Sequence, residues 1–172
     1  GWTCGFFRLN GRLYQPGDLG RVIGSEIGIQ IERPDRPGGV LFDNMTALDN
    51  LCTSLIPKAG QHIIRKKIVS SILSEALRWF PKEMLLQPLS SWSYPERLRF
   101  SYYRWYLLNP RLLICFFPFA GQESTHHKMI IDLLVLCAQR GMAVWIISSG
   151  IDAICEKTDN EEFLRRLHYL NK

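Results

Sequence analysis

The side chains that could support catalysis or bind a metal are few and scattered along this sequence. His126 and His127 lie near Cys115, but adjacent residues on a helix point in different directions and cannot chelate one ion as residues four apart can. Ser93 and Ser149 carry hydroxyl groups, yet no GxSxG or comparable turn marks either as a nucleophile. We therefore expect no catalytic residue and no metal site here.

One predicted strand ends at a position where functional side chains would be expected. The apolar run 111–120 follows Asn109–Pro110 and precedes Gly121, a pattern typical of a buried parallel strand that leads into a loop. In a phosphate-handling protein the end of such a strand carries carboxylates, but here the two positions are Phe116 and Phe117. The rings could form a hydrophobic docking spot. We favour the alternative that they fill the volume of an absent ligand, because two aromatic rings bury a large apolar area.

A second candidate is the stretch 97–106, in which arginines alternate with aromatic residues. Such interleaving is found in platforms that bind single-stranded nucleic acid. On a helix, however, these rings spread over several faces. We therefore favour packing in the core with a basic outer edge, and Cys137 on the next apolar helix is also expected in the core.

Composition sets broad limits on fold and location. The 172 residues suffice for one domain, and 47% hydrophobic with 22% charged residues is typical of a globular protein. The net charge of +5 permits contact with nucleic acid or an acidic membrane but does not require it. Five cysteines without a CxxC pair indicate free thiols in a reducing compartment. No apolar run reaches the ~20 residues of a membrane span, and no signal peptide is evident, so we expect a cytoplasmic protein.

The candidate residues named above must be positioned by alternating strands and helices. The pattern predicts the following elements: a hairpin over 6–14 around Asn10–Gly11, a strand over 27–32, a helix capped by Thr46 that runs through Leu51, helices over 61–80 and 96–108, a strand over 111–117, a helix over 124–139 and a strand over 143–149. The last three form a strand–helix–strand unit with parallel strands. Any site should lie beyond the carboxyl ends of these strands, at 116–121 and 148–152.

The order of these segments resembles the nucleotide-binding domain of an ABC transporter, particularly the ATPases of bacterial sugar importers. Five pieces carry the resemblance: 5–11 is similar to the "SGEI-LNG" hairpin, 26–31 to the strand that leads into the Q-loop, 41–51 to "L-MSV-DNL", 104–114 to "ARWLL-NPKVLIL" before Walker B, and 141–149 to the H-loop strand "GKAVILISS". The resemblance covers nearly all of residues 5–160. It implies an α/β fold of the P-loop NTPase-related, ABC-ATPase-like type, with a mostly parallel sheet, an N-terminal β-hairpin and a helical subdomain at about 47–108.

Several positions depart from the family pattern. No GxxxxGK[ST] sequence is present; in the family it would precede Gly5, and the start without Met suggests that the chain is cut from something longer. The signature loop maps to 92–96, where Ser93 and Glu96 are kept but Tyr94 and Pro95 replace glycines that approach the γ-phosphate.

The catalytic positions are altered too. The Walker B Asp and the following Glu map to Phe116 and Phe117, the D-loop Asp maps to Glu123, and the H-loop His maps to Ser149 or Gly150. A phenylalanine can neither hold magnesium through water nor polarise an attacking water. The resemblance therefore implies remnants of a nucleotide site at Ser93, Glu96, Phe116, Phe117, Glu123 and Ser149.

We interpret the sequence as one truncated, degenerate ABC-ATPase-like domain spanning 1–172. We expect it to act without hydrolysis, as a structural or regulatory partner in carbohydrate uptake or a related sensing system. The ATP and magnesium of the family are not expected as cofactors of this chain. Its partner would be another nucleotide-binding domain, in a possible dimer, or a membrane or sensor component that holds it at the inner face of the membrane. Candidate contact residues at the Q-loop position are Arg33, Asp35 and Arg36.

Two other functions stay open. One is a functional ATP-binding subunit of a sugar ABC transporter, whose phosphate loop is encoded upstream. The Phe116–Phe117 ending argues against it, because both carboxylates are missing from the strand beside the Walker A helix. The other is a nucleic-acid-binding or transcription-regulatory module that uses the basic aromatic helix, which we consider unlikely.

Overall fold

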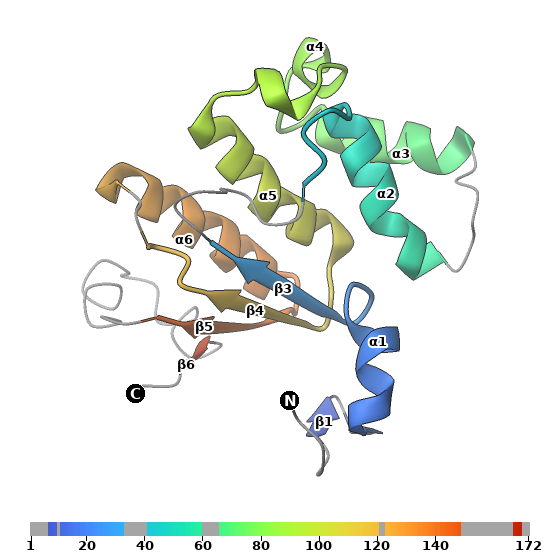
Figure 1. The fold of residues 1–172 in the computed structure, drawn as a ribbon, viewed down its shortest axis with the longest axis vertical. Helices are drawn as coiled ribbons and strands as arrows, with labels where there is room; N and C mark the ends of the chain where they lie inside the picture. The colour runs from blue at the N-terminus through green and yellow to red at the C-terminus, as the bar shows by residue number, and fades with distance from the viewer. Residues whose placement is uncertain are drawn as a thin grey trace.

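The protein is an α/β structure in which helices cover one face of a parallel sheet (Figure 1). The computed structural model describes residues 7–9, 11–32, 41–59, 66–120, 123–148 and 167–169. The sheet has four parallel strands in the order β3-β4-β5-β6, and a separate antiparallel pair is formed by β1 and β2. The strands are β1 (Phe7–Leu9), β2 (Arg12–Tyr14), β3 (Ile27–Ile31), β4 (Leu112–Phe116), β5 (Ala143–Ile147) and β6 (Leu167–Tyr169).

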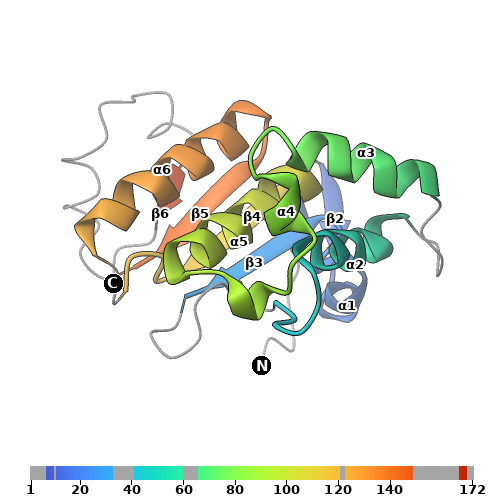
Figure 2. The same ribbon diagram turned by 90° about the horizontal axis from the view of Figure 1, so that it is seen from above.

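The helices fall into two layers above the sheet. Both α5 and α6 lie directly on the sheet, and α2, α3 and α4 pack beyond α5 (Figures 1 and 2). The α-helices are α1 (Leu19–Val22), α2 (Ala47–Ala59), α3 (Lys66–Ala76), α4 (Lys82–Leu85), α5 (Tyr94–Leu108) and α6 (Ser124–Gln139); two short 3-10 helices are η1 (Pro16–Asp18) and η2 (Leu89–Ser91). None of the described helices is both long and apolar enough to cross a bilayer.

Several predicted elements are confirmed. The hairpin over 6–14 is β1 and β2, and Gly11 has the positive φ of 80° that the turn requires. Helix α2 begins after Thr46, whose Oγ1 accepts a hydrogen bond of 3.1 Å from the backbone N–H of Asp49. The strand–helix–strand unit is β4, α6 and β5, with β4 and β5 paired in parallel.

Other boundaries were wrong. The helix predicted over 61–80 is α3, which ends at Ala76 and is followed by a turn, while residues 61–65 lie outside the described part. Helix α5 begins at Tyr94 instead of residue 96, because Pro95 fits the first helical turn, where its missing N–H costs nothing. The short elements η1, α1, α4, η2 and β6 were not predicted. Too few residues form each of them to produce a periodic pattern.

The core forms where helix α5 meets the sheet on one side and α2–α4 on the other. The sheet-side cluster includes Leu113, Val144 and Ile146, all at most 1% exposed. Gly28 of β3 lies directly under Trp105 of α5, and the missing side chain allows the indole ring to approach the strand. This contact fixes how closely α5 lies on the sheet.

The opposite face of the sheet is more open. Ile31 is 46% exposed and Trp145 is 38% exposed, and Phe116, paired with Ile31, is only partly buried on this face. Near the start of β3 this face is covered by Tyr14 of β2 and Val22 of α1, which pack with Ile27 and Leu112; the larger helices α5 and α6 lie on the other face (Figure 1).

Candidate functional site

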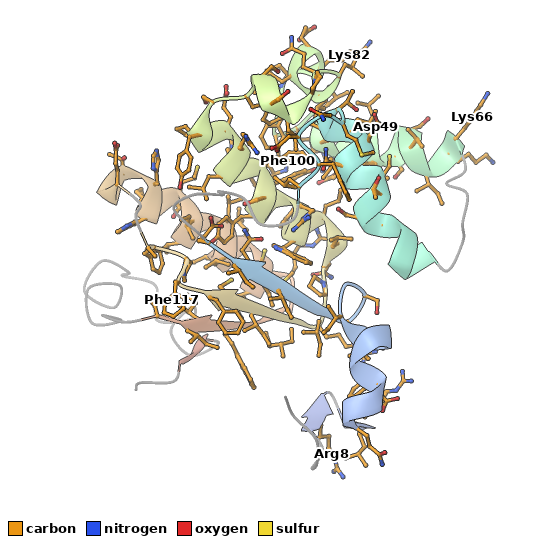
Figure 3. All side chains as sticks on the ribbon, viewed as in Figure 1. Arg8, Asp49, Lys66, Lys82, Phe100 and Phe117 are labelled. Atoms are coloured by element: carbon orange, nitrogen blue, oxygen red, sulfur yellow. The ribbon has the colours of Figure 1, made fainter. Side chains whose placement is uncertain are left out.

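The candidate site lies at the carboxyl end of β4. Phe116 is the last residue of the strand and is half-buried, whereas Phe117 is 45% exposed (Figure 3). The prediction that both rings fill the volume of an absent ligand stays a prediction, but the Phe117 ring is nearly half exposed. The reason is the backbone, because Phe117 has a φ of 51° and turns out of the strand direction.

Hydrogen bonds on both sides hold this unusual conformation. The Phe117 N–H donates to Ile147 O at 2.7 Å, and the Ala120 N–H donates to Phe117 O at 2.9 Å. A bulky residue in the left-handed region costs roughly 1–2 kcal/mol, which these contacts offset. The strand-end position thus offers an exposed aromatic ring on a fixed backbone and no oxygen ligand.

A buried carboxylate that the site prediction missed lies at the same edge of the sheet. Glu32 follows β3, is 3% exposed, and its N–H donates to Phe116 O at 3.2 Å. Its Oε1 accepts a hydrogen bond of 2.6 Å from Gln30 Nε2, and Gln30 Oε1 accepts one of 2.6 Å from Trp105 Nε1. The chain of contacts therefore runs from Glu32 through Gln30 to helix α5, on the face of the sheet opposite to Phe116. Polar residues two apart in an otherwise apolar strand were the signal in the sequence.

This polar group perturbs a neighbouring tyrosine. Burial raises the pKa of the Tyr102 hydroxyl well above its ordinary value, and Cys115 and Glu32 raise it further. Tyr102 is 1% exposed and stays protonated at neutral pH. Tyr102 therefore cannot act as a base at neutral pH.

Ser93 and Glu96 lie together at the N-terminus of α5, where they form a capping box. The Ser93 N–H and Oγ both donate to Glu96 Oε2, at 2.8 and 2.6 Å. These bonds lower the pKa of Glu96, the side-chain bond being the larger cause. The helix terminus that would otherwise attract a phosphate already holds a carboxylate from its own first turn.

The starts of α5 and α6 lie close together. Tyr94 packs against His126 with ring centroids 5.8 Å apart, and Glu123 is the exposed residue immediately before α6. An ion pair between Arg97 and Asp43 ties α5 to the segment before α2. Ser149, Arg33, Asp35 and Arg36 lie outside the described residues, so their predicted roles stay predictions.

The two histidines contact different neighbours, as adjacent helical residues should. His126 faces Tyr94, and His127 packs against Phe119 with ring centroids 5.1 Å apart. In the part of the chain that the structure describes, no group of three His, Cys, Asp or Glu side chains is arranged to hold a metal ion.

Among the described residues, Cys115 and Cys137 are buried cysteines. Cys137 is fully buried, as predicted, and burial raises its pKa to about 12. Burial likewise raises the pKa of Cys115 well above its ordinary value. Both groups therefore remain thiols at neutral pH.

The prediction that the basic aromatic stretch packs in the core is confirmed. Phe100, Tyr102, Tyr103 and Trp105 are at most 6% exposed, so their faces cannot stack on nucleic-acid bases. The prediction of a basic outer edge is wrong for Arg104, because this residue is only 7% exposed. Its guanidinium carbon lies 4.6 Å from the centre of the Trp105 ring. Burial lowers the pKa of Arg104 to about 10, so the side chain keeps its charge at neutral pH.

Comparison with known proteins identifies distant relatives of this chain by sequence. No family model matches the chain. A Clostridium perfringens protein named as an ABC transporter ATP-binding protein is 23% identical over 163 residues, which cover 91% of this chain and 27% of that protein. A Pseudomonas syringae pv. tomato protein named as a ribose/galactose/methyl galactoside import ATP-binding protein is 25% identical over 158 residues, 90% of this chain and 30% of that protein. The chain thus spans less than a third of the length of these curated relatives.

Solved structures give the same fold. A dimeric ATP-binding cassette in a post-hydrolysis state, bound to ADP and phosphate, superposes with a TM-score of 0.64 at 18% identity, covering 98% of this chain and 70% of that one. A part of the cbiONQ ABC transporter complex of Clostridium perfringens gives a TM-score of 0.61 at 20% identity, covering 84% of this chain and 53% of that one. The predicted α/β fold and the resemblance to ABC transporter nucleotide-binding domains are confirmed.

Proposed function

We propose that this chain, which has the fold of an ABC ATPase cassette and relatives among ABC transporter ATP-binding proteins, is a non-hydrolytic cassette domain with a structural or regulatory role. The observation that carries the proposal is the end of β4, where Phe116 and Phe117 stand and no side-chain oxygen is offered. A magnesium ion needs oxygen ligands in near-octahedral geometry, and an attacking water needs a carboxylate or similar base. The described strand end fits neither requirement.

The N-terminus of α5 supports the same conclusion. A phosphate that approached Ser93 would have to displace the Glu96 carboxylate, which accepts both the Ser93 N–H and its hydroxyl hydrogen. A like charge already occupies the place of an incoming anion. In addition, Pro95 offers no N–H to a phosphate.

A role through partners is consistent with the open face of the sheet. Parallel sheets are normally covered on both faces, and here Ile31 and Trp145 remain substantially exposed. A second cassette, or a membrane or sensor component of a carbohydrate-uptake system, is the partner we propose. The relatives' import of ribose or galactose suggests the transport class, and a cytoplasmic location would follow from it.

ATP hydrolysis by the purified protein tests the proposal directly. We expect phosphate release by this chain to stay at background in the presence of ATP and magnesium. The variant Glu32→Gln removes the buried carboxylate of the residue whose backbone N–H donates to Phe116 O, and it should leave phosphate release at background. Release above background that disappears in Glu32→Gln or Ser93→Ala would refute the proposal, because it would trace hydrolysis to this chain.

Nucleotide binding separates the proposal from a functional cassette completed by an upstream phosphate loop. Isothermal calorimetry of this chain with ATP and magnesium should show no micromolar affinity. Micromolar binding accompanied by turnover would favour the functional subunit instead.

A further inference from the structure

Strand β3 is the outermost strand of the parallel sheet, because the described strands follow the order β3-β4-β5-β6 (Figure 2). Along such a strand the backbone groups of successive residues point alternately toward the neighbouring strand and away from it. The even-numbered residues of β3 face β4: Glu26 O accepts a hydrogen bond from the first residue of β4, and the Glu32 N–H donates to the last one. The N–H and C=O groups of Ile27, Ile29 and Ile31 therefore point to the outer edge.

This outer edge is used at its amino end only. The Gly24 N–H donates to Ile27 O at 2.7 Å, and a parallel bridge joins Ile23 to Ile27. Among the described residues, no group lies at hydrogen-bond distance from the outward N–H and C=O of Ile29 and Ile31. Ile31 is also 46% exposed, so this part of the edge can be reached from outside. Exposed edges are usually blocked by lysine or proline, and the stretch from Ile27 to Ile31 contains neither.

We propose that two copies of this chain pair through the outer edges of their β3 strands, antiparallel to each other and about a twofold axis at Gln30. Ile29 of each copy then lies opposite Ile31 of the other, and each opposed pair exchanges two N–H···O bonds. Two residues with two outward groups each give four groups per copy, so the four resulting bonds use all of them. The interface is self-complementary, as a twofold axis requires.

Two observations favour this register. An axis at Ile29 would place Ile27 opposite Ile31, but Ile27 O already accepts a hydrogen bond from Gly24. The axis at Gln30 also places Glu32, which is 3% exposed, opposite a glycine (residue 28) of the second copy. The two buried carboxylates therefore do not oppose each other, which like charges across a strand pair would make unfavourable.

The pairing also reduces the exposed apolar surface of the sheet. Directly opposed residues of antiparallel strands share a face, so each exposed Ile31 gains an isoleucine neighbour on the open face. The two sheets join into one continuous sheet whose open faces lie on the same side. No nucleotide takes part in these contacts. The inference therefore goes beyond the proposed function and does not depend on whether the chain binds or hydrolyses ATP.

Sedimentation velocity without nucleotide tests the pairing. We expect a reversible dimer with a dissociation constant of about 1–100 μM, because only a short stretch of each copy pairs. Amide hydrogen exchange followed by NMR locates the interface. The amides of Ile29 and Ile31 should become more protected as the protein concentration rises, whereas the amides of Gly28 and Gln30, which face β4, should be protected at every concentration.

A charge placed on the edge tests it independently. Ile31→Lys introduces a cation at the position opposite Ile29 and should weaken the dimer at least about tenfold. Leu77→Lys is the matched control, since Leu77 is 45% exposed and lies in the turn after α3, away from β3. This variant should dimerise like the unmodified protein. Circular dichroism shows whether each variant is folded, and the exchange pattern of the unmodified protein decides the question even if Ile31→Lys fails to fold.

Three results would overturn the inference. One is a protein that stays monomeric up to about 1 mM, since even weak specific interfaces assemble at that concentration. Another is a dimer in which the amides of Ile29 and Ile31 exchange at the same rate as in the monomer, because the copies would then meet elsewhere. The third is equal weakening of the dimer by Ile31→Lys and Leu77→Lys, which would show only a general effect of added charge.

Discussion

Replacing Gly28 by alanine tests how closely α5 packs on the sheet. A β-carbon at this position would lie 2.8 Å from Trp105 Cε3, 2.9 Å from Trp105 Cζ3 and 3.0 Å from Leu113 Cδ1. Ordinary carbon contacts are about 3.5–4.0 Å, so each approach is too short by about half an ångström or more. The new methyl group therefore requires the ring, the leucine or the strand to move.

Neither neighbour can move cheaply. Leu113 is fully buried, and Trp105 is held by the hydrogen bond from its Nε1 to Gln30 Oε1 at 2.6 Å. Overpacking of this kind costs about 1–3 kcal/mol, and the gain from replacing glycine inside a strand returns about 0.5–1 kcal/mol. We expect Gly28→Ala to lower the free energy of unfolding by about 1–2 kcal/mol, which corresponds to a fall of about 2–8 °C in Tm for a chain of this size.

Urea denaturation followed by circular dichroism and tryptophan fluorescence measures this difference. The matched control is Gly20→Ala in α1, because a β-carbon there meets nothing within 4 Å and alanine favours a helix. Its stability should be unchanged or slightly higher. Equal unfolding midpoints for Gly28→Ala and the unmodified protein would refute the packing argument, as would a comparable loss in Gly20→Ala.

Two further predictions concern polar contacts of α5. Trp105→Phe leaves Gln30 Oε1 without its buried donor and should cost about 1–3 kcal/mol in chemical denaturation, more than Trp145→Phe at a 38% exposed position on β5. The pKa of Glu96 is lowered from 4.5, so its capping contribution is complete above that value and is lost as the pH falls through the lower pKa of the folded state. Thermal melts from pH 7 to pH 3 should therefore show the advantage of the unmodified protein over Glu96→Gln shrinking as the pH falls; an advantage that stays constant or grows would contradict the assignment.

The candidate site was predicted only in part. The strand over 111–117 and its Phe116–Phe117 ending follow from an apolar run closed by Pro118, and the structure has them in β4 and the turn after it. The positive φ of Phe117 could not be predicted from the sequence, because phenylalanine, unlike glycine or asparagine, is not enriched in left-handed backbone conformations. The exposure of its ring therefore follows only from the structure.

The start of α5, where the capping box lies, was also predicted only in part. Ser93 and Glu96 are three residues apart, so their hydrogen bonds are local and could have been read from the sequence as a helix start. The predicted start at residue 96 is two residues late, because Tyr94 and Pro95 already belong to the first helical turn.

The features that depend on neighbours along the chain follow from the sequence: the hairpin at Gly11, the strand–helix–strand unit β4–α6–β5, and the strand ending at Phe116 and Phe117. Hydrophobic periodicity and turn-forming residues are properties of neighbouring positions, so they can be recognised in the sequence. The positions of three side chains follow only from the tertiary structure: Trp105 over Gly28, the buried Glu32 that accepts a hydrogen bond from Gln30, and Arg140 on Tyr106. These contacts join residues that are far apart in the chain. The distances between them are set by how the helices pack on the sheet, and no local sequence pattern encodes that packing.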